Sequence, residues 1–381
     1  MSSAPDPAAT RPGAPTPAAT PPAGPDLGDA VTGGPGAGGG HPALRAGPEV
    51  VTVGETMVVL APDPVGPLDA ADRVSLGVGG AESNVAMGLS RLGHRAAWLS
   101  RVGDDPFGRM VVGRIAAAGV DVDLVTVDPT APTGLYAKDP GRDATAVHYY
   151  RRGSAATRLD PAVLDDPRLA GVRLVHLSGI TAALSSSCLS LVERAVDDRP
   201  VSGATVSFDV NHRPRLWSAG RAAEVLRRLA DAADVVLVGL DEARTLWGVT
   251  DAEAVRALLP GPTTVVVKDA AVGATALPRV GAATFVPALR VPVVEPVGAG
   301  DAFAAGYLGG VLRGLEPRAA LRLGHLCAAR TLMVAGDTAP PPPWDRCAEL
   351  VGLADPLWSA LDPAAIDPPG ALGVRAPGSP D

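Results

Sequence analysis

Short, continuously apolar runs alternate with longer amphipathic segments through most of the chain. Strands buried on both faces have such runs, which are predicted at residues 50–53, 96–101, 174–177, 205–209, 235–238 and 264–268. Helices are predicted over residues 82–92, 108–118, 221–232, 241–247, 299–313 and 317–334. This alternation predicts an α/β fold, a doubly wound and mainly parallel sheet flanked by helices.

Two segments interrupt the alternation. Residues 57–76 and 133–151 contain shorter, half-polar strands, which predict a small antiparallel sheet added to the main one. Such a sheet is typical of a β lid that closes over a ligand and excludes water. The edge strands of a lid need cover, which a homodimer or higher homo-oligomer formed through the lids would provide.

The two ends of the chain differ in composition from its middle. Residues 1–48 consist mainly of Ala, Pro, Gly, Thr and Ser, so we predict a disordered tail. Residues 49–338 are predicted to form the folded domain. The prolines at 340–343 end its last helix. Beyond them we expect a weakly helical piece over about 344–361 within a Pro-rich, weakly ordered extension over 339–381.

Composition narrows the classes of function. The 381 residues carry a net charge of −8, which argues against a nucleic-acid partner held by general electrostatics. No run approaches the ~20 apolar residues of a membrane span, and the N-terminus does not resemble a signal peptide. The three cysteines lie far apart and predict neither disulfides nor a zinc site. We therefore expect a cytoplasmic protein with no membrane partner.

The strongest chemical signal lies at residues 295–306, where an extended segment leads into a helix of small residues. Gly298, Ala299 and Gly300 place backbone N–H groups at the start of this helix, where an anion is favoured. Asp301 follows in the first turn and is the candidate catalytic base, which would accept the proton of a hydroxyl attacking a phosphoryl group. Taken alone, a helix start with a dipole-satisfying Asp explains the segment equally well.

No other catalytic set competes with this segment. The sequence contains no Gly-Lys pair, and therefore no Walker A motif, and it has neither HExxH nor GxSxG. Of its six histidines none shows metal-ligand spacing, and His176, which follows an apolar strand, is predicted to be a core residue. Lys138 and Lys268 are the only two lysines, so almost all positive charge is carried by arginine.

Two longer patterns resemble the signatures of ribokinase-like (PfkB-type) carbohydrate kinases. Gly-Gly-Ala-Glu-Ser-Asn-Val-Ala at 79–86, with Arg-Val-Gly-Asp-Asp-Pro-Phe-Gly at 101–108, resembles their N-terminal signature, and residues 295–306 resemble their C-terminal one. The resemblance covers about residues 50–335. Within the family the chain most resembles 2-keto-3-deoxygluconate kinases, through residues 149–156, 176–181, 209–213, 216–218 and 295–307. It implies a ribokinase-like fold with a β lid and the use of ATP and Mg²⁺.

The resemblance also implies a set of sugar contacts. Their positions in this sequence are Gly80, Asn84, Tyr136, Tyr149, Arg151 and Arg213. Physical chemistry agrees for the arginines, because a sugar acid needs a cation and Arg offers a bidentate fork. Each residue also has a plain structural alternative: a surface ion pair for the arginines, lid packing for the tyrosines, and a local hydrogen bond for Asn84.

The resemblance implies contacts to the nucleotide as well. The implied contacts are Lys268, Gly273, Gly298, Gly300 and His325, with Glu242 as the carboxylate that organises Mg²⁺ through water. A strand-end lysine with its ammonium in solvent, and a solvent-facing helix charge at Glu242, are the structural alternatives.

Several positions depart from the family pattern. Glu295 replaces a more frequent Asp, Gly239 replaces Asn or Ser, and His325 stands where Asn is frequent near the adenine. Ala270 replaces a glycine in the turn after Lys268. Since Ala tolerates a positive φ poorly, we expect the nucleotide loop to be reshaped.

These observations lead to one leading hypothesis and two alternatives. The first is ATP-dependent phosphorylation of a primary hydroxyl of 2-keto-3-deoxygluconate, or its galactonate epimer, to the 6-phosphate. The second is another kinase of the family acting on a neutral sugar or nucleoside such as fructose or ribose, which the pair Arg151 and Arg213 disfavours. The third is a catalytically weak sugar- or nucleotide-binding module, supported only by Ala270.

Overall fold

The computed structural model describes residues 47–141 and 145–366. The predicted N-terminal tail lies almost entirely outside the described residues, as do residues 367–381 of the predicted C-terminal extension.

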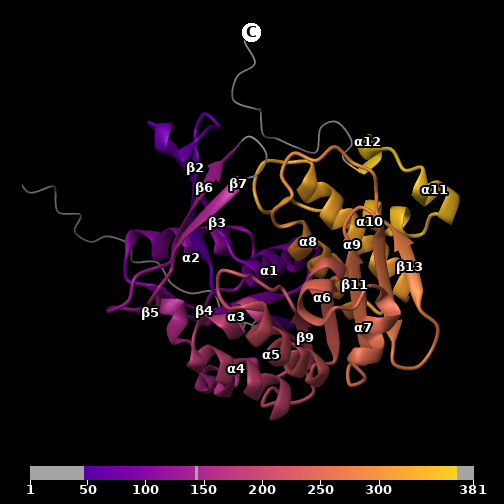
Figure 1. Cartoon of the computed structure of the whole chain (residues 1–381), viewed down its shortest axis with the longest axis horizontal. Helices are drawn as coiled ribbons and strands as arrows, with labels where there is room; N and C mark the ends of the chain where they lie inside the picture. The colour runs from indigo at the N-terminus through magenta and orange to yellow at the C-terminus, as the bar shows by residue number, and fades with distance from the viewer. Residues whose placement is uncertain (1–46, 142–144, 367–381) are drawn as a thin grey trace, which may run out of the picture. The chain divides into compact units, whose positions relative to one another are not determined.

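The main sheet has nine strands in the order β13-β12-β11-β10-β9-β8-β1-β4-β5 (Figure 1). In chain order these are β1 (Val50–Val53), β4 (Ala96–Gly103), β5 (Val125–Asp128), β8 (Leu174–Ser178), β9 (Thr205–Asp209), β10 (Val235–Gly239), β11 (Thr264–Asp269), β12 (Gly273–Pro278) and β13 (Thr284–Pro287). Strands from β11 to β5 are parallel, and β12 and β13 are antiparallel additions. The six predicted strands and the mainly parallel sheet are confirmed.

The sheet is buried on both faces, as its apolar runs require. Leu237 of β10 belongs to one hydrophobic cluster, whereas its neighbours Val236 and Val238 belong to the cluster on the opposite face. This follows from the two-residue period of a strand. The strand order reverses between β1 and β8, and ligands of open α/β sheets bind at such a point, beyond the carboxyl ends of the strands.

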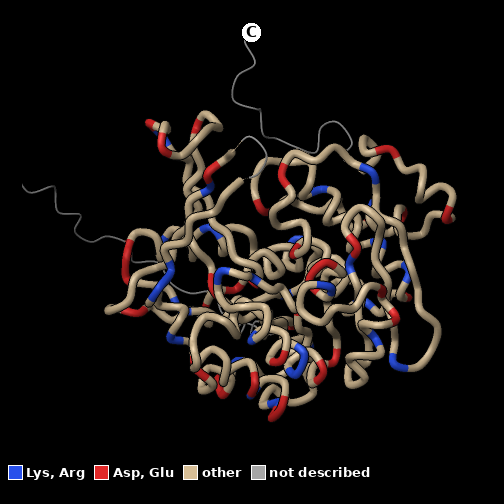
Figure 2. The backbone as a smooth tube through the Cα atoms, in the orientation of Figure 1, with Lys and Arg blue, Asp and Glu red and all other residues tan. Residues whose placement is uncertain are grey.

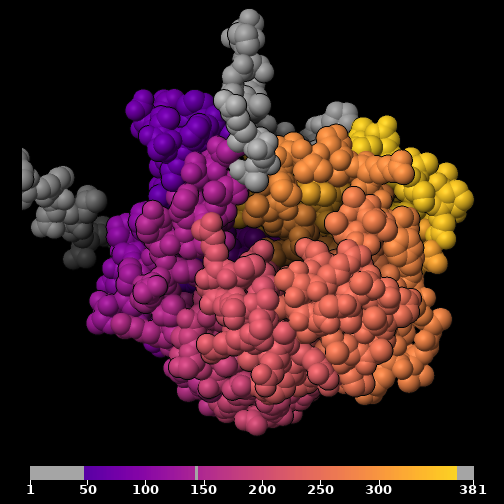
Figure 3. Space-filling model, viewed as in Figure 1, coloured from indigo at the N-terminus to yellow at the C-terminus, as the bar shows by residue number. Residues whose placement is uncertain are grey.

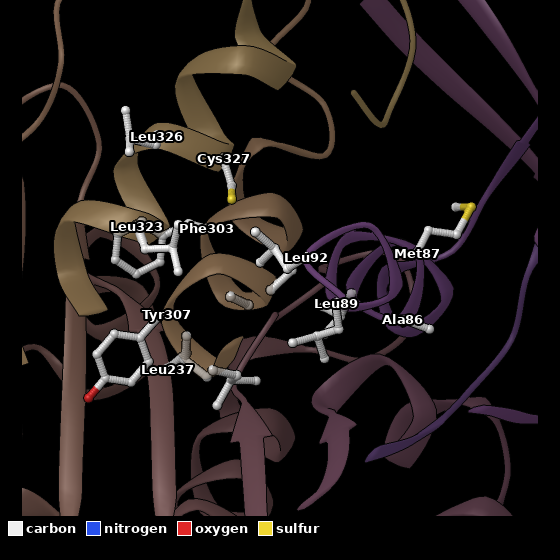
Figure 4. Close-up of a cluster of buried hydrophobic side chains, with 14 of the residues drawn as sticks. Ala86, Met87, Leu89, Leu92, Leu237, Phe303, Tyr307, Leu323, Leu326 and Cys327 are labelled. Carbon is white, nitrogen blue, oxygen red and sulfur yellow. The ribbon is translucent and has the colours of Figure 1, made fainter. Parts of the chain in front are cut away.

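Helices cover the two faces. One cluster includes residues of α1 (Ala81–Arg91), α2 (Pro106–Ala117), α8 (Ala299–Leu312), α9 (Pro317–Leu332) and α10 (Trp344–Val351). Figure 4 shows Leu92, just after α1, on the side that faces Phe303 of α8, with Leu323 of α9 beyond. The other cluster includes residues of α3 (Gly179–Leu184), α4 (Ser186–Asp197), α5 (Ala219–Ala232), α6 (Leu240–Trp247) and α7 (Ala252–Leu258).

The lid is a second sheet of four strands, in the order β3-β2-β6-β7. Its strands are β2 (Met57–Pro62), β3 (Val74–Gly79), β6 (Leu135–Pro140) and β7 (Thr145–Tyr150). The predicted small sheet is present, although β2 and β6 are parallel while the other pairs are antiparallel. Short 3₁₀ turns occupy Leu68–Ala70, Ala155–Arg158, Pro161–Asp165 and Pro167–Leu169. The hydrophobic core of the lid is small, and it consists of Met57, Val59 and Tyr136, with Val147 packed against them.

The C-terminal extension is more ordered than predicted. Residues 344–366 form α10, α11 (Asp355–Ser359) and α12 (Pro363–Ile366). Trp358 and Ile366 are almost fully buried, and the Trp358 indole N–H donates to the Pro287 carbonyl of β13 at 3.1 Å. The helical piece expected at about 344–361 is present, and two large apolar side chains anchor this part of the extension to the domain.

Charged residues are spread over the described part of the chain. In Figure 2, basic and acidic positions are interspersed over the described part of the chain. Within residues 47–141 and 145–366, none of the helices has the length and apolar character needed to cross a membrane.

Candidate active site

Charged residues meet at the carboxyl ends of neighbouring parallel strands. Asp209 ends β9 and Lys268 lies near the end of β11, and the Lys268 Nζ is 2.8 Å from the Asp209 Oδ2. Asp209 is 3% exposed, and its Oδ1 has no hydrogen-bond partner among the described residues. Figure 3 shows the surface hollowed where the magenta, salmon and orange segments meet.

The start of α8 has the backbone geometry expected of an anion site. Gly298, the N-cap, has a φ of 83°, and a Cβ there would lie 1.9 Å from the Asp337 carbonyl oxygen, so only glycine fits. Beyond it, the first N–H groups of the helix have no intrahelical acceptors. A Cβ on Gly300 would meet only the Lys268 ammonium, at 3.9 Å. Backbone donors and an ammonium thus converge where a phosphate would bind.

Asp301 lies in the first turn of this helix, next to the anion site. The Asn84 Nδ2 of α1 donates to its Oδ2 at 2.8 Å. Burial raises the pKa of Asp301 to about 7, although the Asn84 hydrogen bond and the charge of Arg213 lower it. A carboxylate with such a pKa suits a base working near neutral pH. The Asn84 Oδ1 is buried and has no partner among the described residues, which leaves it free to accept from a substrate hydroxyl.

Glu242 lies beside the Asp209–Lys268 pair. Its two oxygens accept the backbone N–H groups of Gly239 at 2.9 Å and of His212 at 2.8 Å. Burial first, and then the charge of Asp209, raise the pKa of Glu242. The oxygens keep further lone pairs, and the unpartnered Asp209 oxygen is close, so the residues fit a hard cation held partly through water.

The two candidate arginines occupy different environments. The Arg151 side chain is 11% exposed and forms an ion pair with the fully buried Glu55, whose Oε1 also accepts from the Ser154 hydroxyl at 2.5 Å. Arg213 is exposed, and no ion pair holds it among the described residues. Its charge lowers the pKa values of Asp301 and Glu242, which places it close to both carboxylates.

The remaining predicted sugar contacts lie at the lid. Tyr136 is 7% exposed, and its hydroxyl donates to the Asp337 Oδ2 at 2.8 Å. Tyr149 is 40% exposed, and its ring centroid lies 5.6 Å from that of Tyr136. Gly80 caps α1, and a Cβ there would lie 2.4 Å from the Glu55 carbonyl. Close backbone packing therefore accounts for the glycine at 80 without a ligand.

The nucleotide loop keeps its turn despite the alanine. Ala270 has a φ of 41°, in the left-handed region, and the Val272 N–H donates to the Asp269 carbonyl at 2.8 Å. Ala270 thus adopts the backbone conformation that glycine favours. Gly273 follows with a φ of 152°, and a Cβ there would lie 2.4 Å from the Val286 carbonyl.

His325 is placed in the core. It is 6% exposed, its Nε2 lies 3.1 Å from the Val286 carbonyl, and its ring meets Phe303 edge-on at 5.1 Å. Burial lowers the pKa of His325 to about 4. This position supports a packing role in place of the predicted adenine contact, because the ring is enclosed by protein atoms.

Sequence reasoning missed several residues near the site. Glu82 of α1 is fully buried and accepts from the Ser178 and Thr181 hydroxyls at 2.6 Å each, and Glu55 holds Arg151. A glutamate inside a segment of small residues was the available signal for Glu82. Lys138 was also missed, although a lysine is conspicuous in a chain that has two.

The geometry combines a base near neutral pKa, an anion cradle with a lysine, and an exposed arginine. A hydroxyl placed between Asn84 and Asp301 can lose its proton to Asp301 while attacking a phosphoryl group in the cradle. The arrangement is suited to phosphoryl transfer onto an alcohol.

Comparisons with known proteins agree with this chemistry. The sequence profile described as pfkB family carbohydrate kinase matches residues 48–344. A 2-dehydro-3-deoxygluconokinase of Thermoproteus tenax is 37% identical over 300 residues, covering 76% of this chain and 89% of that protein. A 2-dehydro-3-deoxygalactonokinase of Haloferax volcanii is 34% identical over 298 residues, with 76% and 93% covered. The crystal structure of a PfkB protein from Polaromonas sp. JS666 is 36% identical, with a TM-score of 0.71, and 80% of this chain and 100% of that one are covered.

Proposed function

The chain belongs to the pfkB family of carbohydrate kinases, and on that premise we propose that it phosphorylates a sugar acid with ATP. The proposed acceptor is 2-keto-3-deoxygluconate or its galactonate epimer, and the product is the 6-phosphate. Similarity to a 2-dehydro-3-deoxygluconokinase and a 2-dehydro-3-deoxygalactonokinase, each covering 76% of this chain, supports the substrate class.

The observation that carries the proposal is the Asn84–Asp301 hydrogen bond beside the start of α8. Asn84 fixes the carboxylate through its Nδ2, and its free Oδ1 can accept from another hydroxyl of the sugar and so orient the substrate. Asp301 removes the hydroxyl proton as the oxygen bonds to the γ-phosphorus, and the bond from phosphorus to the oxygen bridging to the β-phosphate breaks. The N–H groups of α8 and the Lys268 ammonium balance the charge on the transferring group.

Asp209 and Glu242 are the residues that would hold Mg²⁺, through water. When bound, the ion neutralises phosphate charge. Lys268 has a second task in the protein itself, because its ammonium compensates the buried Asp209 carboxylate. This ion pair reduces the repulsion between the Asp209 carboxylate and the phosphates of bound ATP.

Arg213 is the proposed ligand of the sugar carboxylate. It is exposed, has no ion pair among the described residues, and lies near Asp301. Arg151 is already paired with Glu55, so it serves this role only by sharing its guanidinium between two carboxylates. A guanidinium that is free to turn offers the bidentate contact a carboxylate prefers.

The proposal is tested by ADP release with ATP and Mg²⁺ over a panel of 2-keto-3-deoxygluconate, its galactonate epimer, fructose, ribose and adenosine. Turnover confined to the two keto acids, with a phosphorus NMR signal assigned to a 6-phosphate, is the expected result. Turnover on fructose or ribose alone would overturn the role of Arg213. Silence from folded protein, together with no ATP binding by calorimetry, would favour a binding module instead.

A further inference from the structure

Side chains from three separate segments meet beside the anion site, outside the groups that act on the hydroxyl. Lys138 and Tyr136 are two residues apart on β6 and share a face. The Lys138 Nζ lies 3.0 Å from the Glu295 Oε2 and 3.0 Å from the Asp337 Oδ1. Asp337 also accepts from the Tyr136 hydroxyl at 2.8 Å. We call Lys138, Glu295 and Asp337 the latch.

Both carboxylates of the latch contact the segment that leads into α8. The Glu295 Oε1 accepts the Val297 N–H at 3.2 Å, within the turn that precedes Gly298. The Asp337 carbonyl lies so close to Gly298 that no Cβ fits between them. Lys138 therefore joins a strand of the lid to the two groups that flank the N-cap of α8.

The latch is largely shielded from water. The side chains of Lys138, Glu295 and Asp337 are 10%, 21% and 7% exposed. Burial alone would lower the pKa of Lys138, but the two carboxylates more than offset it and the pKa is raised. Removing one partner from such a group leaves an uncompensated buried charge, so the remaining carboxylates would separate or draw in water.

The length of the side chain at position 295 fits this arrangement. Residue 295 is a Glu, which carries its carboxylate one methylene further from the backbone than an Asp would. That carboxylate contacts both the lid lysine and the turn before Gly298. A shorter side chain at 295 would have to give up one of these two contacts unless the backbone moved.

We propose that the latch couples the position of lid strand β6 to the geometry of the α8 anion site, and that Lys138 is a positioning residue for phosphoryl transfer. This inference rests on the proposed kinase function. With the latch formed, the lid covers the site and the N–H groups of α8 are aligned with the γ-phosphoryl group.

With the latch broken, water gains access to the γ-phosphorus in place of the sugar hydroxyl. The water oxygen then bonds to the phosphorus, its proton passes to Asp301, and the bond to the oxygen bridging to the β-phosphate breaks. The products are ADP and inorganic phosphate, without sugar phosphate. Uncoupled hydrolysis is therefore a signature that a merely structural role for Lys138 would not produce.

The test compares Lys138→Met with Asp139→Asn, both in the full chain. Asp139 is the next residue of β6, and its pair with His148 is much more exposed and touches neither Glu295 nor Asp337. For Lys138→Met we expect sugar phosphorylation to fall about 10²-fold, ADP released per sugar phosphate to rise above one, and amides of β6 to exchange hydrogen faster. Asp139→Asn should resemble the unaltered protein in all three.

Two further variants, Glu295→Gln alone and Glu295→Gln combined with Lys138→Met, protect the test against loss of folding. In Lys138→Met with Glu295→Gln, the charge removed from the lid is matched by one removed from the loop, and the combined loss of turnover should be smaller than the product of the two single losses. Phosphorylation and β6 exchange unchanged in Lys138→Met, or losses that multiply in the double variant, would overturn the latch. Hydrogen exchange needs no substrate, so it tests the contact between lid and loop independently of activity. If the unaltered chain turned over none of the sugars, that result would count against the proposed function and not against the latch.

Discussion

The strand-end side of the site and its lid side hold charged groups in different ways. At the strand ends, Asp209 and Lys268 come from strands separated only by β10, and Glu242 is fixed by two backbone N–H groups. On the lid, Arg151 and Lys138 are held by carboxylates from segments remote in sequence. The neighbouring strand ends of the main sheet bring the first set together, whereas the second set depends on how the lid packs against distant segments. We therefore expect substitutions at the strand ends to affect chemistry, and those on the lid to affect stability or closure.

The largest effect is expected at Asp301. Asp301→Asn preserves shape and the Asn84 contact but cannot take a proton, so kcat should fall by ~10²–10⁴. The measurement is steady-state ADP release on the keto acid that the enzyme uses, with circular dichroism to verify folding. Asp241→Asn is the matched control, because Asp241 is an exposed carboxylate in the first turn of α6. A loss in Asp301→Asn of less than tenfold would remove Asp301 as the base.

The two arginines sharpen the comparison further. Arg213→Gln should raise KM for the sugar acid about 10–100-fold, the value of one charge-assisted hydrogen-bonded contact, with little change in melting temperature. Arg151→Met should instead lower the free energy of unfolding by about 3–5 kcal/mol, because Glu55 stays buried without its partner. Kinetics and thermal melts on both variants separate these outcomes.

The reverse pattern would contradict the assignment. If Arg151→Met folded normally and lost only acid-sugar turnover, while Arg213→Gln kept its KM, then the lid arginine would bind the carboxylate. Arg151→Met combined with Glu55→Gln removes both charges and should recover part of the lost stability, since no unpaired ion remains.

The sequence predicts the strand-end side of the site better than its lid side. The parallel strands, the anion loop and Asp301 were predictable, because apolar runs, glycines and the residues after them act locally. The pairing of Glu55 with Arg151, and of Lys138 with Glu295 and Asp337, depends on how the lid docks, which no local pattern encodes. The helical piece at about 344–361 was predictable from the sequence, but its packing onto the domain was not, since that depends on two anchors, Trp358 and Ile366.

Replacing Asn84 tests whether its hydrogen bond to Asp301 tunes the pKa of the base. Asp301 must be deprotonated to act, and its pKa is about 7, so kcat/KM should fall as pH decreases through that region. The Asn84 hydrogen bond lowers this pKa. Asn84→Ala should therefore move the acidic limb of the pH–rate profile upward by roughly one pH unit, besides lowering the rate. A limb that stays in place, or moves to lower pH, would show that Asn84 acts only on the sugar.

The smallest effect is expected at Ala270, on the nucleotide loop. Its φ of 41° costs an alanine ~1–2 kcal/mol, which glycine does not incur. Glycine in turn loses about 0.5–1 kcal/mol through the greater freedom of the unfolded chain. Ala270→Gly should therefore raise the free energy of unfolding by about 1 kcal/mol or less, measured by denaturant unfolding.

Ala271→Gly is the matched control for that prediction, because it makes the same chemical change at the next residue, which has no positive φ. Only the unfolded-state loss applies there, so Ala271→Gly should destabilise by about 0.5–1 kcal/mol. The difference between the two variants isolates the strain of the left-handed alanine from the cost of glycine itself. Equal effects at 270 and 271 would mean that the turn relaxes in solution, and the loop, unlike the strand ends, would not be fixed by its backbone.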